Sequence, residues 1–219
     1  VSGFQVHVGV DKVYTSGDKC DVLVAMNPAA LKTNIKFTTP DSIIIIDADS
    51  FTQRDLEKAL YKTNYAIEEL GITNQVVAAP ITSLCKDSLK DSGMDNKSIL
   101  RSKNMLALGL VCWLFNYPLE HSEQMLRDKF ARKPEIAEAN IKVLNDGYNY
   151  GHNIHASVST YRIESTAKKE KGIYTDINGN LATAYGLIAA SEKAKLPLYL
   201  GSYPITPATD ILHYLSKFK

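Results

Sequence analysis

Four consecutive isoleucines, residues 43–46, constrain the fold more than any other part of the sequence. Ser42 and Asp47 bound this short apolar run, in which every residue is β-branched. A strand that is apolar without interruption is typical of a parallel sheet whose two faces are both covered by helices. The run therefore predicts a central strand in a layered α/β fold.

Two further apolar runs predict strands beside it. They are residues 21–26 (DVLVAM) and the shorter residues 75–80 (QVVAAP). The first run leads into Asn27 and Pro28, which suit the N-cap and the first position of a helix. A polar stretch over residues 53–70 predicts a second helix, which Gly71 ends. Strands that alternate with helices favour an α/β fold with a mostly parallel sheet.

The middle of the chain predicts helices. Residues 98–115 are apolar nearly all round, which indicates a central buried helix. Residues 119–130 and 134–150 carry charge on one face, which is typical of helices that cover a core. We expect the glycines at positions 147 and 151 to end this helical region.

Composition excludes several classes of protein. The formal net charge of +1 gives no electrostatic case for binding nucleic acid or a membrane surface. No apolar run reaches the roughly 18 residues that a spanning helix needs. The three cysteines, Cys20, Cys85 and Cys112, are far apart and form no C-x-x-C pair. This pattern favours a reducing compartment, so we expect a cytoplasmic protein, and it argues against a zinc or iron–sulfur site built from this chain alone.

Residues 201–207 (GSYPITP) predict a rigid turn near the C-terminus. The preceding apolar residues 196–200 predict a buried strand, and the spacing of apolar residues over 208–218 is helical. Thr206 suits the N-cap of that helix and Pro207 its first position. The free amides at such a helix start favour negative charge, so the turn is a candidate anion site.

Two segments of the C-terminal part resemble the pyrimidine-binding domain of 2-oxoacid:ferredoxin oxidoreductases. In that family an N-G-N-x-A-x-A-x-G helix leads into a G-x-Y-P-I-T-P loop, as residues 178–190 and 201–207 do here. Residues 21–31, 43–49 and 103–109 resemble the gamma domain of the same family. A gamma domain followed by a pyrimidine-binding domain in one polypeptide is similar to the fused gamma–alpha subunits of the 2-oxoglutarate type.

The resemblance implies a domain organisation. Residues 1–151 correspond to the gamma domain, a layered α/β domain with a mostly parallel sheet, and residues 152–172 to a linker. Residues 173–219 correspond to the start of the pyrimidine-binding domain, with its first helix, strand and helix. The family's gamma domain opens with a strand and a glycine-rich turn that nothing before Asp21 supplies. We therefore expect about fifty residues to be missing at the front. A doubly wound sheet also does not finish with one strand and its flanking helices, which leave apolar surface uncovered, so we expect a segment of a longer polypeptide.

The chemistry that the resemblance implies is oxidative decarboxylation of a 2-oxoacid. Thiamine diphosphate attacks the keto group, electrons pass through iron–sulfur clusters to ferredoxin, and coenzyme A takes the acyl group. In the family a partner beta subunit holds the diphosphate and its magnesium, and the activating glutamate lies downstream of the Y-P-I-T-P loop. The chain alone should therefore be inactive and contain no catalytic residue. We expect Thr206 to donate a hydrogen bond to the 2-oxoacid and Tyr203 to line the same pocket.

Other functions stay open at this point. The chain could be a non-catalytic assembly or docking module, or belong to a pyruvate or branched-chain oxoacid member of the family. A nucleotide-dependent dehydrogenase would use Asp47 and Asp49 to contact a ribose, but the expected glycine fingerprint is missing.

Two smaller motifs have simple structural interpretations. Asn27 could lie near coenzyme A in a gamma domain, although helix capping explains it more directly. His152 and His155 form an H-x-x-H pair, but no cysteine or acidic cluster stands nearby to complete a metal shell, so we interpret them as surface histidines.

Overall fold

The computed structural model describes residues 3–9, 13, 15–154, 161–162, 172–173, 175, 177–203 and 205–218. Its contacts divide the chain into two compact units, Val1–Ala167 and Lys168–Lys219. Each unit has its own set of packed elements, and they are described in turn.

A parallel three-stranded sheet, in the order β1-β2-β3, forms the centre of the first unit. The register places Ala25 opposite Ile46, and Asp47 opposite Ala79, so the carboxyl ends of the strands meet at one edge. All three predicted strands are confirmed, and the second begins earlier than predicted. Their bounds are Cys20–Ala25 (β1), Thr38–Asp47 (β2) and Val76–Ala79 (β3).

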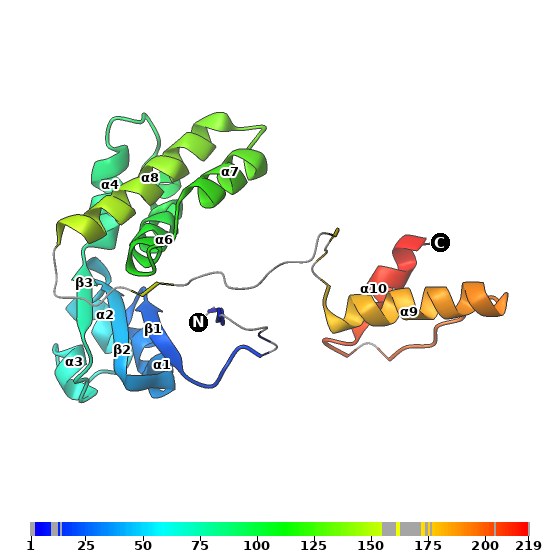
Figure 1. Ribbon diagram of the computed structural model, residues 1–219. Coiled ribbons are helices and arrows are strands. Elements are labelled where there is room, and N and C mark those ends of the chain that lie inside the picture. The colour runs from blue at the N-terminus through cyan, green and yellow to red at the C-terminus, as the bar shows by residue number, and fades with distance from the viewer. Residues whose placement is uncertain are drawn as a thin grey trace. The chain divides into compact units, whose positions relative to one another are not determined.

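Helices cover both faces of this sheet, as the four isoleucines predicted (Figure 1). Ile43 and Ile45 pack against buried side chains of α4, α5, α6 and α8, whereas Ile44 and Ile46 pack on the other face with residues from α1 and α3. The helices of the first face are α4 (Ile81–Leu89), α5 (Asn96–Arg101), α6 (Lys103–Leu114) and α8 (Pro134–Asn153), and α7 (Glu120–Lys129) packs against α8. Those on the other side are α1 (Pro28–Asn34), α2 (Gln53–Lys58) and α3 (Ala66–Glu69), with short 3-10 turns η1 (Ile35–Phe37) and η2 (Ala48–Ser50).

Glycines allow α6 and α8 to approach each other closely. A β-carbon added to Gly109 of α6 would lie 2.1 Å from the carbonyl oxygen of Leu144 in α8. One added to Gly151 would lie 2.4 Å from the indole ring of Trp113. The prediction that Gly147 and Gly151 end the helical region is therefore wrong. Both lie inside α8, where the absence of a side chain is what the packing requires.

Two predicted helices are each divided in the structure. Residues 98–115 were expected to form one helix, but Ser102 separates α5 from α6, and α5 begins after Asp95, whose side chain caps it. Residues 53–70 contain α2 and α3 with a turn between them, in which Leu60 has a φ of 60°. A left-handed residue cannot continue an α-helix, so the helix ends before it.

The second unit contains α9 (Gly179–Ala194), α10 (Thr209–Leu215) and the 3-10 turn η3 (Ser216–Phe218). Helices α9 and α10 pack together, and the rings of Tyr185 and Phe218 meet edge to face with centroids 5.9 Å apart. Residues 196–200 were predicted to be a strand, and this is wrong: they are extended but form no ladder. A strand needs a neighbour for its backbone groups, and none of the described residues of this unit supplies one.

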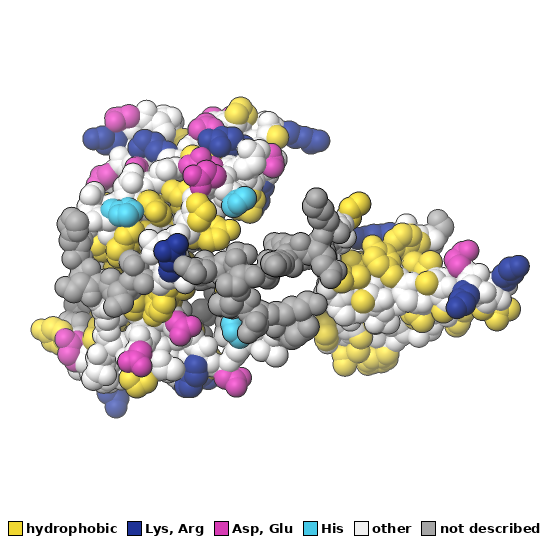
Figure 2. Space-filling model, in the orientation of Figure 1, with side chains coloured by type: hydrophobic (Ala, Val, Ile, Leu, Met, Phe, Trp, Pro, Cys, Tyr) yellow, Lys and Arg dark blue, Asp and Glu magenta, His cyan; other side chains and the backbone are white. Residues whose placement is uncertain are grey.

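Apolar side chains remain on the surface of this second unit (Figure 2). Ala184 is its one buried residue among those described, although the sequence of α9 is apolar nearly all round. Large apolar side chains stand in solvent after α9 and in α10; they are Leu196, Leu198, Tyr199, Tyr203, Ile205, Leu212 and Phe218.

None of the helices in the described part of the chain has both the length and the apolar character needed to cross a bilayer.

Candidate functional site

A buried carboxylate lies at the carboxyl edge of the sheet. Asp47, the last residue of β2, is fully buried and accepts hydrogen bonds from Ser50 Oγ (2.7 Å), Thr82 Oγ1 (2.7 Å) and the Thr82 amide (3.2 Å). The ammonium of Lys103, the first residue of α6, lies 3.5 Å from Asp47 Oδ2. This one side chain therefore links the ends of β2, α4 and α6.

The environment of Asp47 sets its pKa. Burial by itself raises the pKa, because it disfavours the charged form. The hydrogen bonds from Ser50 and Thr82 and the positive charge of Lys103 act in the opposite direction and together lower the pKa below its usual value. Asp47 is thus ionised at neutral pH, and its oxygens are engaged with Ser50, Thr82 and Lys103.

The other polar residues at this edge also have structural partners. Asn27 Oδ1 accepts a hydrogen bond from the Ala30 amide (2.8 Å), which confirms that Asn27 is the N-cap of α1. Asp49 Oδ2 accepts from the Ser83 amide (2.6 Å) near the start of α4. The residues that sequence patterns suggested for ribose or coenzyme A contact are thus engaged with the protein's own backbone.

The turn over residues 201–207 differs from its prediction. Helix α10 starts at Thr209 and Ala208 occupies its N-cap position, so the prediction that Thr206 caps the helix is wrong. The Thr209 amide instead donates to the Ile205 carbonyl (3.0 Å), and the turn occupies residues 206–208. The turn is closed by its own backbone, which leaves the Thr206 hydroxyl available.

The two predicted substrate-binding residues both face solvent within the second unit. Among the described residues, the Thr206 hydroxyl has no hydrogen-bond partner. The side chain of Tyr203 is 78% exposed. An unpaired, exposed hydroxyl can donate a hydrogen bond to a ligand.

Asn180 contacts this turn, and sequence reasoning missed it. Its Nδ2 donates to the Pro207 carbonyl oxygen at 2.9 Å, across 27 positions of sequence. Asn178, which caps α9 through the Leu181 amide (2.8 Å), donates from Nδ2 to the Tyr214 hydroxyl at 3.2 Å. The signal was present as the N-x-N spacing at the start of α9, but only the fold shows which groups the two side chains reach.

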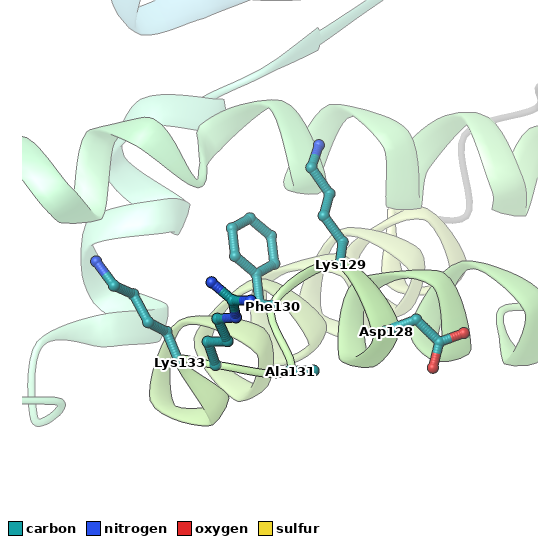
Figure 3. A pocket seen from close by; sticks show the side chains of 6 residues that line it. Asp128, Lys129, Phe130, Ala131 and Lys133 are labelled. Atoms are coloured by element: carbon teal, nitrogen blue, oxygen red, sulfur yellow. The ribbon is translucent and has the colours of Figure 1, made fainter.

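A separate hollow of about 280 Å³ lies in the loop between α7 and α8. Figure 3 shows Lys129, Phe130 and Lys133 pointing to the same side, whereas Asp128 points away. Arg132 also lines it. The hollow contains none of the predicted site residues, and its lining comes from one short stretch of chain.

The histidine pair is only partly described. The ring of His152 lies against those of Tyr148 and Trp113, with centroids 4.9 Å and 6.4 Å away, whereas His155 lies outside the described residues. Among the described residues no three or more side chains of His, Cys, Asp or Glu come together in a way that could hold a metal ion.

The family model for "Pyruvate ferredoxin/flavodoxin oxidoreductase" matches residues 1–150, more than half of the chain. The chain belongs to the pyruvate ferredoxin/flavodoxin oxidoreductase family. The resemblance inferred from the sequence motifs is thereby confirmed for the first unit, whose layered α/β fold is the one expected.

Two proteins are similar to nearly the whole of this chain. The 2-oxoglutarate oxidoreductase subunit KorA of Mycobacterium tuberculosis is 48% identical over 220 residues, covering 100% of this chain and 33% of that protein. The 2-oxoglutarate:ferredoxin oxidoreductase of Magnetococcus marinus, solved with 2-oxoglutarate, coenzyme A and succinyl-CoA bound, superposes with a TM-score of 0.67. At 24% identity it covers 94% of this chain and 31% of its own, and it shows a shared fold. The chain spans about a third of the length of both relatives.

Proposed function

We propose that the chain is part of the alpha subunit of a 2-oxoglutarate:ferredoxin oxidoreductase. The observation that carries this proposal is the 48% identity with a 2-oxoglutarate oxidoreductase subunit, which extends through both units rather than the family domain alone. The enzyme would convert a 2-oxoacid, coenzyme A and oxidised ferredoxin into acyl-CoA, carbon dioxide and reduced ferredoxin. The substrates bound in the Magnetococcus marinus structure favour 2-oxoglutarate as the oxoacid.

Within this proposal the two units have separate roles. Residues 1–151 form the gamma domain, residues 152–172 link it onward, and residues 173–219 begin the pyrimidine-binding domain. Thr206 donates its free hydroxyl to the carboxylate or keto oxygen of the oxoacid, and Tyr203 lines the same pocket. A hydroxyl that donates to the keto oxygen binds the negative charge that develops on that oxygen more strongly than the uncharged carbonyl of the ground state.

The cofactors belong to the assembled enzyme. Thiamine diphosphate would supply a nucleophile that adds to the keto carbon and an electron sink for the bond that breaks as carbon dioxide leaves, and iron–sulfur clusters would take up the electrons. As the family resemblance implies, we assign the magnesium to the partner beta subunit and the clusters to the rest of the complex. The chain by itself should therefore be inactive. Its three free cysteines fit a reducing compartment, for which we propose the cytoplasm.

Reconstitution tests this proposal directly. The full-length protein is produced with its beta partner, and reduction of a viologen dye is followed with 2-oxoglutarate, pyruvate or a branched-chain oxoacid, each with and without coenzyme A. We expect turnover that requires coenzyme A and is fastest with 2-oxoglutarate. Absence of turnover with every oxoacid would count against the proposal and favour an assembly role, whereas a preference for pyruvate would change the substrate alone.

A further inference from the structure

One side-chain contact from α9 reaches the turn that contains Thr206, in addition to the turn's own backbone hydrogen bond from the Thr209 amide to the Ile205 carbonyl. The side chain of Asn180, the second residue of α9, donates from Nδ2 to the carbonyl oxygen of Pro207 at 2.9 Å. That carbonyl belongs to the residue that directly follows Thr206 in the chain. The contact therefore joins the first turn of one helix to the backbone beside the proposed substrate-binding hydroxyl.

The Pro207 carbonyl has a second donor. The amide of Asp210, in the first turn of α10, also donates to it, at 3.2 Å. A carbonyl oxygen has two lone pairs, so both donors can be satisfied at once. With donors from α9 and α10, the peptide group at Pro207 has little freedom to rotate, and the adjacent Thr206 takes its direction from that group.

Asn180 is itself held in place by its helix. The side chain of Asn178 caps α9 through the Leu181 amide, and its Nδ2 reaches the Tyr214 hydroxyl in α10. The start of α9 thus contacts the chain before α10, at Pro207, and near the end of α10, at Tyr214. A donor on a well-anchored helix start is better placed to fix a turn than one on a loop.

Packing of α9 on α10 does not depend on Asn180 alone. Tyr185 of α9 also packs against Phe218 of the following turn η3, and the N-cap Asn178 donates to Tyr214 of α10. Loss of one exposed hydrogen bond should therefore leave the unit folded. It should instead allow the Pro207 peptide group to move, and with it the Thr206 hydroxyl. Catalysis is sensitive to small displacements of a positioned group, so we expect a lower rate.

We propose that Asn180 is a positioning residue for oxoacid binding and acts through Thr206. This inference rests on the proposed function, in which the Thr206 hydroxyl contacts the 2-oxoacid. Asn180 itself need not touch the substrate, since the distance that carries the argument is the one to Pro207.

A double-mutant cycle in the complete oxidoreductase tests the inference. Asn180→Asp has nearly the same shape but cannot donate to Pro207, and a carboxylate in the first turn of α9 favours the helix. We expect kcat/KM for the 2-oxoacid to fall by about 3–10-fold, the range that one hydrogen bond of ordinary strength allows. The KM for coenzyme A should not change. In a Thr206→Val background the same substitution should cost less than about twofold, because the group on which it acts is gone.

Two further variants complete the experiment. Asn180→Ala removes the amide without adding charge. If the Asn180→Asp enzyme fails to assemble, the kinetics of Asn180→Ala test the inference instead. Both variants should lower kcat/KM for the 2-oxoacid. Gly186→Ala changes the same helix where an added β-carbon has no atom within 4 Å, so its kinetics should stay close to the unchanged enzyme.

The outcomes separate this inference from the proposed function. Normal kinetics in both Asn180 variants, with a defect in Thr206→Val, would overturn the positioning role and leave the proposed function intact. Equal losses for Asn180→Asp with and without the Thr206 hydroxyl, or a matching rise in the KM for coenzyme A, would show a general structural effect and also overturn it. A normal Thr206→Val enzyme would overturn both the role of Thr206 and the role of Asn180 through it.

Discussion

Gly147 of α8 lies so close to Leu106 of α6 that an added β-carbon would come 2.2 Å from the Leu106 carbonyl oxygen. The obstructing atoms belong to the backbone, so a rotamer change cannot relieve the contact. The reciprocal contact at Gly109, against the Leu144 carbonyl, has the same character. The two helices thus pack backbone to backbone, next to the side chains that cover one face of the sheet.

Gly147→Ala should destabilise the first unit. In most helix interiors this change stabilises, because alanine is the better helix former by about 1 kcal/mol. Here α6 and α8 must move apart, and overpacking of this kind costs about 1–3 kcal/mol, occasionally more. Urea unfolding followed by the fluorescence of Trp113, the single tryptophan of the chain, measures the change.

Gly186→Ala is the matched control. Gly186 also lies inside a helix, α9, but an added β-carbon there would have no atom within 4 Å. Its substitution should leave stability unchanged or raise it slightly. A stability gain at Gly147 equal to that at Gly186 would show that α6 and α8 are not in close contact.

Asp47→Asn should destabilise the sheet edge. The substitution keeps the shape but places an amide against donors from Ser50, Thr82 and Lys103. Loss of hydrogen bonds to a charged acceptor costs about 1.5–3 kcal/mol. Lys103→Met is the comparison. The Lys103 ammonium is the most distant partner of Asp47, at 3.5 Å, and is partly exposed, so its removal should lower the free energy of unfolding by less. A larger loss for Lys103→Met would contradict this ranking.

The contribution of Asp47 to stability should depend on pH with a definite sign. Burial raises the pKa, but the hydrogen bonds and Lys103 outweigh it, so the folded pKa lies below the unfolded value of about 3.9. A lowered pKa stabilises the fold at pH above the unfolded value, and this stability is lost as the pH falls through the folded pKa. The difference in unfolding free energy between the unchanged protein and Asp47→Asn should be constant near neutrality and shrink below about pH 4. A difference that stays constant through that range would mean that Asp47 is not ionised in the fold.

Asn27 offers a test of capping against ligand binding. Asn27→Ala should cost about 1 kcal/mol, the usual value of an N-cap, whereas Asn27→Ser retains a capping oxygen and should cost little. Thermal unfolding of both variants measures this difference. In the complete enzyme, the KM for coenzyme A should be unaltered by Asn27→Ser. A raised KM with normal stability would instead place Asn27 in the coenzyme A site.

Thr206 can be tested with a pair of substitutions that separate its hydroxyl from its shape. Thr206→Val removes the hydroxyl and keeps the branched side chain, and it should lower kcat/KM for the oxoacid by an amount corresponding to about 1–3 kcal/mol. Thr206→Ser keeps the hydroxyl and should retain most of the activity. Steady-state kinetics of the assembled enzyme decide the matter, and an equal loss in both variants would implicate the methyl group rather than the hydroxyl.

The sequence predicted the parts of the fold that depend on local pattern. The run of residues 43–46 identified a strand covered on both faces, since consecutive β-branched residues suit no other common environment as well. Asn27 and Pro28 marked a helix start for the same local reason, which the cap geometry confirms. Family motifs then led to Thr206 and Tyr203, which composition and periodicity alone would not have selected.

What the sequence could not predict depends on partners far along the chain. The glycines of α8 resemble helix terminators, and only the presence of α6 about forty positions earlier shows that they permit close packing. The break at Ser102 falls within the polar residues 101–104 (RSKN), but a short polar segment also suits the exposed side of one continuous helix, so the pattern alone does not place the break. Residues 196–200 have the composition of a strand, but no described neighbour completes a ladder with them. The hydrogen bond from Asn180 to Pro207 joins residues 27 positions apart, which no local pattern reveals.

The apolar surface of the second unit has a practical consequence for protein production. Leu196, Leu198, Tyr199 and Phe218 all stand in solvent there, around a pair of helices that buries almost nothing of its own. Surfaces of this kind attract one another and attract chaperones. Residues 168–219 expressed by themselves would therefore aggregate in a concentration-dependent way. A solubilising fusion, or coexpression with the rest of the enzyme, would be the better route to soluble protein.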